Sequence, residues 1–193
     1  MTTIVVVRKG DSAVIAADSL TTFGTTRLAP AYDRHPQKVT AYGDSFIGVA
    51  GSAAHQLVLE NVLERNPSLD LAGRPAIYET FRKLHPVLKD EAFLNPKEEE
   101  DDPYESSQMT VMIANPSGIF AVYSMREVFE FDRFWAIGSG RDFALGAMYS
   151  VYGRAKGAAA VAEAGVVAGA EFDTGTALPI DLHEVALKTG VGP

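Results

Sequence analysis

Cysteine is absent from the 193-residue sequence, and this absence excludes disulfide bonds, thiolate nucleophiles and zinc–thiolate sites together. The four histidines show neither an HExxH motif nor a close paired spacing, so we expect no metal site. Lysine and arginine number 17 against 25 aspartate and glutamate residues, which gives a net charge of −8. This balance disfavours binding to nucleic acid, whose phosphates require clustered basic side chains.

Long hydrophobic runs are also missing. No apolar stretch approaches the roughly 18 residues of a membrane span, and the N-terminus lacks the basic region of a signal peptide. We therefore expect a cytoplasmic protein that does not bind a membrane. Hydrophobic residues make up 47% of the sequence, which suffices for a substantial core in a single domain spanning residues 2–193.

A nucleotide-binding motif is lacking as well. Gly138-Ser139-Gly140 resembles part of a phosphate-binding loop, but no Gly-Lys-Ser/Thr sequence follows it. Phe143 occupies the position where a dinucleotide fingerprint requires glycine. We therefore expect no cofactor.

The N-terminal sequence Met1-Thr2-Thr3 is able to generate a nucleophile. Removal of Met1 would leave Thr2 with a free α-amino group, whose reference pKa is about 7.7 to 8.0. The threonine hydroxyl is a poor nucleophile at neutral pH, and an amine on the same residue can act as its base. The alternative interpretation is that Thr2 and Thr3, both strand formers, simply begin a β-strand.

Three downstream positions carry groups that such a nucleophile needs. Asp18 ends an apolar strand, Lys38 begins an alternating run, and Gly51 follows a third strand. A buried lysine paired with Asp18 would place positive charge near the hydroxyl of Thr2, and the N–H of Gly51 would point at an oxyanion. Each also has a structural interpretation, as a strand-end cap, a solvated strand residue and a strand-to-helix turn. Their occurrence together, in this order, favours catalysis.

As a set, these segments resemble the proteasomal β-subunit and HslV family of threonine peptidases, and especially its small bacterial HslV-like members. The matching segments are spread over nearly the whole chain: Thr2-Thr3-Ile4, Ala17-Asp18-Ser19, Lys38, Gly48 to Ala54, Ile137-Gly138-Ser139-Gly140 and Phe172-Asp173-Thr174-Gly175-Thr176.

The resemblance implies a catalytic role for each matching residue. Thr2 would be the nucleophile and its amine the base, with Asp18 and Lys38 as the charge pair behind it. Gly51 would supply the oxyanion N–H. The amine would be oriented by hydrogen bonds from three side chains, Ser139, Asp173 and Thr176.

The segment between Asp18 and Lys38 is a few residues longer than is usual in this family. Arg34 is the only other nearby cation, but Lys38 directly precedes the expected strand, so we assign the family lysine to Lys38.

The resemblance also predicts the substrate pocket. Val49 and Ala53, both small and apolar, would line it beside the nucleophile, with Pro36 and Thr40 nearby. Since none of these side chains is charged, we expect cleavage after apolar residues, with weak discrimination of about 1 to 3 kcal/mol per methylene.

The hydrophobic periodicity predicts a layered fold. Strands are expected at residues 3–9, 12–17, 38–42, 46–50, 109–114, 119–123 and 181–187. Helices are expected at residues 53–65, 141–152 and 155–168 and along the stripe from Ile77 to Leu88. This order suits an α+β fold, a four-layer αββα sandwich, and the resemblance implies the same sandwich of the N-terminal nucleophile hydrolase type.

The resemblance implies a threonine endopeptidase that hydrolyses unfolded proteins or peptides. Its partners would be further copies of the chain, in two stacked rings of six or seven subunits, and an ATP-driven unfoldase. Two other functions stay open, namely a free-standing amidohydrolase acting on small amides and a catalytically silent ring or scaffold subunit. The acidic run Glu98 to Asp102 is either a plain solvated connector or a negative collar at the entrance of a ring.

Overall fold

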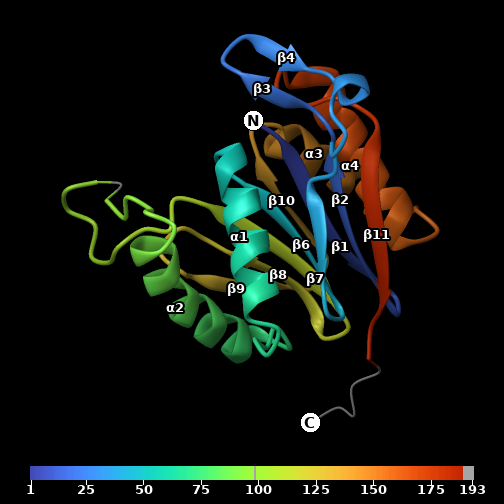
Figure 1. Cartoon of the computed structure of the whole chain (residues 1–193). Coiled ribbons are helices and arrows are strands. Elements are labelled where there is room, and N and C mark those ends of the chain that lie inside the picture. The colour runs from blue at the N-terminus through green and yellow to red at the C-terminus, as the bar shows by residue number, and fades with distance from the viewer. Residues whose placement is uncertain (98, 189–193) are drawn as a thin grey trace.

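The computed structural model describes residues 1–97 and 99–188, which form four layers. Two β-sheets lie face to face, and a pair of helices covers the outer face of each (Figure 1). The first residue of the acidic run, Glu98, lies outside the described residues. The architecture is the αββα sandwich that the sequence predicts.

The first sheet contains four antiparallel strands in the order β10-β1-β2-β11. Strand β1 (Thr3–Lys9) continues through the Gly10-Asp11 turn into β2 (Ser12–Asp18). The edges are β10 (Phe134–Gly138) and β11 (Ile180–Ala186). Gly10 has a φ of +64°, a conformation that glycine adopts without strain, and this allows the tight turn between the two central strands.

The second sheet contains five antiparallel strands in sequential order. They are β5 (Val39–Tyr42), β6 (Ser45–Ala50), β7 (Thr110–Asn115), β8 (Gly118–Val122) and β9 (Val128–Phe131). The segment of the chain that connects β2 to β5 contains a short hairpin and a 3₁₀ helix. The hairpin consists of β3 (Thr21–Phe23) and β4 (Thr26–Leu28), and the 3₁₀ helix is η1 (Pro30–Tyr32).

The helices form the outer layers. Helices α1 (Ala53–Arg65) and α2 (Arg74–Asp90) cover the second sheet, and α3 (Arg141–Tyr152) and α4 (Ala158–Phe172) cover the first. The side chain of Ser52 accepts a hydrogen bond from an N–H of the first turn and so begins α1. No helix within residues 1–97 and 99–188 has the length and apolar character of a membrane span.

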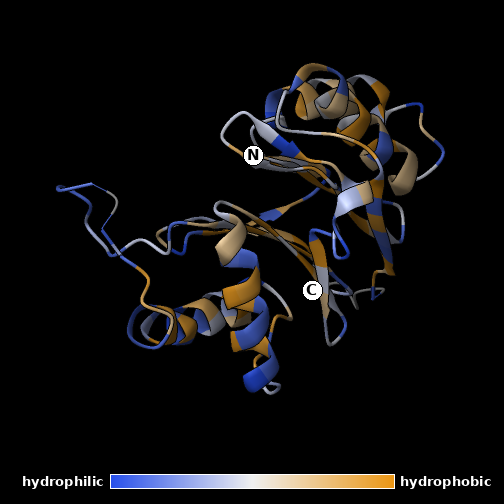
Figure 2. Ribbon diagram, turned by 45° about the horizontal axis from the view of Figure 1, so that its top comes forward, coloured by the Kyte–Doolittle hydropathy of each residue, from blue (hydrophilic) through white to orange (hydrophobic). Residues whose placement is uncertain are grey.

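Strand side chains alternate between separate cores because successive residues point to opposite faces of a sheet. In β1, Ile4 and Val6 lie between the two sheets, whereas Val5 and Val7 pack among residues of α3 and α4. A third core lies between the second sheet and helices α1 and α2. Hydrophobic colours accordingly predominate in the strands between the helical layers (Figure 2). The central strand β1 is therefore buried on both faces, as its run of valines predicts.

Helix α4 differs from the prediction at both ends. It begins at Ala158 rather than at residue 155, and it continues to Phe172 rather than ending at 168. Gly169 lies inside this helix although glycine is a poor helix former. Its lack of a side chain allows close packing, since a Cβ atom there would lie 2.5 Å from the hydroxyl oxygen of Thr3. The helix thereby lies directly on the start of β1.

Four short strands are absent from the sequence-based prediction, namely β3, β4, β9 and β10. Strand β10 is held by long-range pairing with β1, where Ile137 lies opposite Ile4. In β9, Phe129 and Glu130 are exposed, so this strand lacks the continuous apolar character of the central strands. Pairing with distant neighbours stabilises these strands more than their local sequence does.

Candidate active site

Strand ends meet at one end of the sandwich and bring the predicted catalytic residues together. Thr2 precedes β1 and Asp18 ends β2, and the antiparallel pairing of these strands places the two residues side by side. Lys38 precedes β5 and Gly51 follows β6, which also pair antiparallel. The N-terminus lies at this end of the molecule (Figure 1).

Thr2, Asp18 and Lys38 contact one another directly. The hydroxyl of Thr2 donates a hydrogen bond to Oδ1 of Asp18 at 2.6 Å. The ammonium of Lys38 lies 2.8 Å from that hydroxyl oxygen and 2.8 Å from the same carboxylate oxygen. The ion pair predicted between Asp18 and Lys38 is therefore present, and Arg34 is exposed. The hydroxyl of Thr2 lies between the two charges.

Asp18 is fully buried and is satisfied by five donors. Besides Thr2 and Lys38, three backbone N–H groups donate to it, those of Thr3 at 3.0 Å, Leu20 at 3.0 Å and Ala177 at 3.2 Å. These donors satisfy both oxygens of the buried carboxylate. Asp18 thereby holds both the start of β1 and the cation in place.

A second network lies on the amide side of Thr2. The backbone nitrogen of Thr2 donates to the hydroxyl of Ser139 at 3.2 Å, and Ser139 donates to Asp173 at 2.7 Å. Thr176 donates to the same carboxylate oxygen at 2.6 Å. Ser139, Asp173 and Thr176 thus form one connected group around the nitrogen of residue 2.

Two charged groups near Thr2, Lys38 and Asp173, have shifted pKa values. Burial lowers the pKa of the Lys38 ammonium, while the neighbouring Asp18 acts in the opposite direction. Partial burial acts to raise the pKa of Asp173, but hydrogen bonds from Thr176, Ser139 and the N–H of Gly175 hold that pKa below its usual value. Asp173 therefore remains an acceptor over the physiological pH range.

Solved structures match this chain over nearly its whole length. The BPH protein of Thiobacillus denitrificans is 38% identical with a TM-score of 0.91, and the match covers 97% of this chain and 100% of that one. A structure of the same protein in complex with epoxomicin gives 38% identity and a TM-score of 0.89 over 96% and 99% of the two chains. The chain belongs to the proteasomal β-subunit and HslV family.

A more distant member has the same fold. HslV from Trypanosoma brucei is 21% identical and matches with a TM-score of 0.73, covering 95% of this chain and 99% of that one. The αββα sandwich is thus the N-terminal nucleophile hydrolase fold of this family. No protein-family model matches the sequence, and the search of curated proteins finds no match.

In this proteasome-like chain a hollow of about 90 Å³ opens beside Thr2. Its lining includes Lys38 and four residues predicted from the resemblance, Pro36, Val49, Gly51 and Ala53. Thr40, which the sequence also assigns to substrate binding, lines an adjoining hollow instead. The expected pocket is therefore divided between two neighbouring hollows.

Two carboxylates line the adjoining hollow, which the sequence-based expectation of an uncharged pocket did not include. In the adjoining hollow, the hydroxyl of Thr40 donates a hydrogen bond to the carboxylate of Glu60, and Asp33 lies in the same lining. Glu60 follows Ala53 by seven residues on α1, so the two share one face of the helix. The apolar stripe that predicts α1 from the sequence does not include this polar face, which carries Gln56 and Glu60.

Only glycine fits at position 51, because a side chain there would clash with its surroundings. Its φ is +154°, a region that other residues rarely adopt, and a Cβ atom would lie 2.7 Å from Nδ1 of His55. That ring nitrogen accepts a hydrogen bond from the N–H of Ser52 at 3.2 Å, and burial lowers the pKa of His55. His55 therefore supports the turn at Gly51, a role that sequence reasoning missed. A capping pattern of Ser52 with the residue three positions later is the signal that points to it.

Glycines around Ser139 permit the approach of the chain start. A Cβ atom at Gly138 would lie 2.1 Å from the backbone oxygen of Thr2, and one at Gly140 would lie 2.1 Å from the hydroxyl of Thr3. Thr3 is another residue that sequence reasoning missed, since its hydroxyl lies 2.8 Å from that of Thr176. The Gly-Ser-Gly pattern thus reflects backbone packing around residues 2 and 3.

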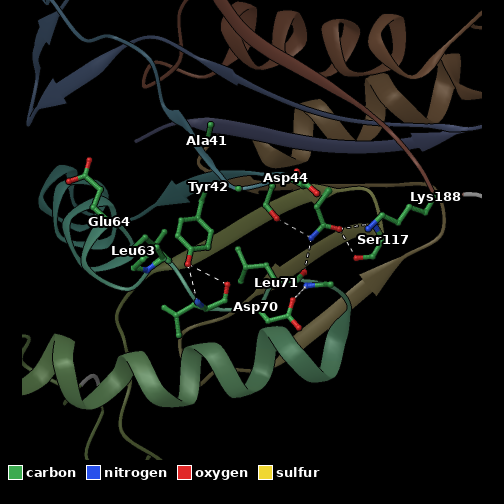
Figure 3. A pocket seen from close by; sticks show the side chains of 15 residues that line it. Ala41, Tyr42, Asp44, Leu63, Glu64, Asp70, Leu71, Ser117 and Lys188 are labelled. Atoms are coloured by element: carbon green, nitrogen blue, oxygen red, sulfur yellow. Dashed lines mark hydrogen bonds between the residues drawn. The ribbon is translucent and has the colours of Figure 1, made fainter.

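A larger pocket of about 520 Å³ lies at the opposite end of β5 and β6 (Figure 3). The hydroxyl of Tyr42 donates to the carbonyl of Asn66 at 2.6 Å, and the amide of Asn115 donates to the carbonyl of Leu71 at 2.7 Å. These bonds join the sheet to the loop between α1 and α2.

Within residues 1–97 and 99–188, no group of three acidic or histidine side chains is arranged to hold a metal ion.

Proposed function

We propose that the chain is the subunit of a threonine endopeptidase whose nucleophile is Thr2 after removal of Met1. The observation that carries this proposal is the position of the Thr2 hydroxyl, 2.8 Å from the ammonium of Lys38 and 2.6 Å from the carboxylate of Asp18. A cation at this distance lowers the cost of forming an alkoxide. Asp18, buried and satisfied by other donors, keeps that cation in place.

In this mechanism the free amine of Thr2 is the base. It takes the proton of the hydroxyl as the oxygen attacks the peptide carbonyl, and a tetrahedral oxyanion forms. The C–N bond then breaks, and the protonated amine returns the proton to the leaving amine. The resulting ester is hydrolysed by water, which the amine deprotonates in the same way, and a carboxylic acid and free Thr2 are released.

Two further groups serve this chemistry. Ser139, held by Asp173, lies 3.2 Å from the nitrogen of Thr2, so the same contact would orient the amine once Met1 is removed. Gly51 lines the hollow beside Thr2, and its N–H is the proposed donor to the oxyanion. One such donor typically contributes about 10²- to 10³-fold to turnover.

The proposed assembly follows from the family. We propose that residues 2–193 form a single peptidase domain and that copies associate into two stacked rings of six or seven, acting on unfolded proteins or peptides. An ATP-driven unfoldase is the proposed partner. The alternatives are a free-standing amidohydrolase and a silent ring subunit, and the contacts of Thr2 with both Asp18 and Lys38 favour the active peptidase over the silent subunit.

The proposed function is tested by three measurements: the intact mass of the chain, the rate of peptide cleavage and the mass of the native assembly. Purified protein should lack Met1 and cleave fluorogenic peptides, and epoxomicin should inhibit it, since the 38% identical BPH protein forms a complex with that compound. Thr2→Ala should abolish turnover, whereas Thr2→Ser, which keeps the hydroxyl, should retain part of it. Full activity in protein that keeps Met1, or in Thr2→Ala, would sink the mechanism.

The mass of the native assembly, taken together with turnover, distinguishes the proposed peptidase from the two alternative functions. An active monomer that cleaves only small amides would support the amidohydrolase, and a ring without Thr2-dependent turnover would support the silent subunit.

A further inference from the structure

The hollow that adjoins the one beside Thr2 has the composition of a site for a basic side chain. It measures about 600 Å³ and lies among the β3–β4 hairpin, the start of β5 and one face of α1. It shares five lining residues with the hollow that contains Thr2, namely Thr21, His35, Gln37, Ala53 and Gln56. The two hollows therefore adjoin along these residues, and the larger one lies next to the place where a bond would be held at Thr2.

One face of α1 forms a wall of this adjoining hollow. Ala53, Gln56, Leu57 and Glu60 have the spacing that places residues on the same helical face. The carboxylate of Glu60 accepts a hydrogen bond from the side chain of Gln56 at 2.9 Å and another from Thr40. These neutral donors hold the carboxylate in a defined position without neutralising its charge.

A second carboxylate lines the same hollow. Asp33 accepts a hydrogen bond from the backbone N–H of His35 at 3.0 Å. Within the part of the chain that the structure describes, neither Asp33 nor Glu60 belongs to an ion pair, and Lys38 is engaged by Asp18. The lining of this hollow therefore contains two carboxylates and no lysine or arginine.

Four large apolar side chains in the lining match the stem of a long basic side chain. Phe23, Leu28, Val39 and Leu57 contribute this surface. Lysine and arginine bury their methylene stems along apolar surface while the charged head stays with polar groups. Because α1 rises about 1.5 Å per residue, Glu60 lies roughly 10 Å along the helix from Ala53, which suits a long side chain.

We propose that this hollow receives the side chain of a lysine or arginine that precedes the scissile bond, with Glu60 as its main counter-ion and Asp33 as a second one. The inference rests on the proposed peptidase function, and it replaces the apolar preference expected from Val49 and Ala53 alone. Glu60 and Asp33 are in this assignment residues that determine specificity, and they take no part in bond cleavage.

The test uses a panel of short fluorogenic peptides that differ only in the residue before the scissile bond, with arginine, lysine, leucine or glutamate. Wild-type protein should cleave the arginine and lysine peptides about 10- to 100-fold more efficiently than the leucine peptide, the range expected for a charged hydrogen bond. Glu60→Gln should remove most of this preference, because it should raise KM for the basic peptides more than for the leucine peptide. Glu60→Lys should reverse the preference toward glutamate.

Glu64→Gln is the matched control, because Glu64 lies one turn further along α1 and is exposed. It should leave the whole profile unchanged. Thr2-dependent cleavage that favours leucine over arginine, or a Glu60→Gln profile equal to wild type, would overturn the inference and leave the proposed peptidase intact. If no peptide is cleaved in a Thr2-dependent manner, the proposed function itself fails and the specificity assignment falls with it.

Discussion

Replacing Lys38 by alanine removes the cation from the centre of the site and leaves a buried carboxylate without its ionic partner. Lys38 is 11% exposed at the side chain and Asp18 is 0% exposed. Breaking a buried ion pair from one side commonly costs about 3 to 5 kcal/mol. Because four other donors to Asp18 remain, we expect a loss at the lower end, about 3 kcal/mol.

This loss has a measurable thermal consequence. In a domain of 150 to 250 residues, 1 kcal/mol corresponds to about 2 to 4 °C, so Lys38→Ala should lower Tm by roughly 6 to 12 °C. The loss of turnover should be larger. Without the cation beside the Thr2 hydroxyl, kcat should fall about 10²- to 10³-fold, the effect seen when one electrostatic donor is removed from a transition state.

The assay pairs thermal unfolding with peptide hydrolysis at one fixed protein concentration, because assembly shifts apparent stability. Arg34→Ala serves as the control, since Arg34 is exposed and surface substitutions usually change stability by less than about 0.5 kcal/mol. A Lys38→Ala protein that keeps both its Tm and its turnover would refute the inference that this ion pair supports the nucleophile. A large effect of Arg34→Ala would do the same.

The remaining predictions concern pH and assembly. The folded-state pKa of Asp173 is lowered, so its contribution to stability is complete above the usual value of 3.8 and is lost as pH falls through the folded value. The stability difference between wild type and Asp173→Asn should therefore shrink below pH 3.8, and a difference that grows in acid would contradict the assignment. Deleting residues 97–104, of which residues 99–104 lie in a loop that extends from the body (Figure 1), should speed degradation of an unstructured protein while hardly changing hydrolysis of a short neutral peptide. Equal changes for both substrates would argue against a collar at a ring entrance.

The sequence by itself determined the central strands, two helices and the group of residues that the structure brings together at Thr2. The apolar runs of β1 and β2 can be buried only between layers, and the helical stripes that begin at Ala53 and Arg141 end where the structure ends them. These are local patterns, and local patterns specify strand and helix periodicity. Thr2, Asp18 and Lys38 could be selected because their order along the chain matches a family whose fold brings them together.

Tertiary structure alone decided which groups touch. The hydrogen bonds that Asp18 accepts from Thr2, Thr3, Lys38 and Ala177 join residues far apart in the chain, as does the hydrogen bond from Thr40 to Glu60. The edge strands β9 and β10 and the continuation of α4 through Gly169 also depend on distant partners, since pairing and close packing stabilise them. The two carboxylates in the hollow that adjoins the one beside Thr2 also depend on tertiary structure, because a helix face becomes a pocket wall only when another segment folds against it.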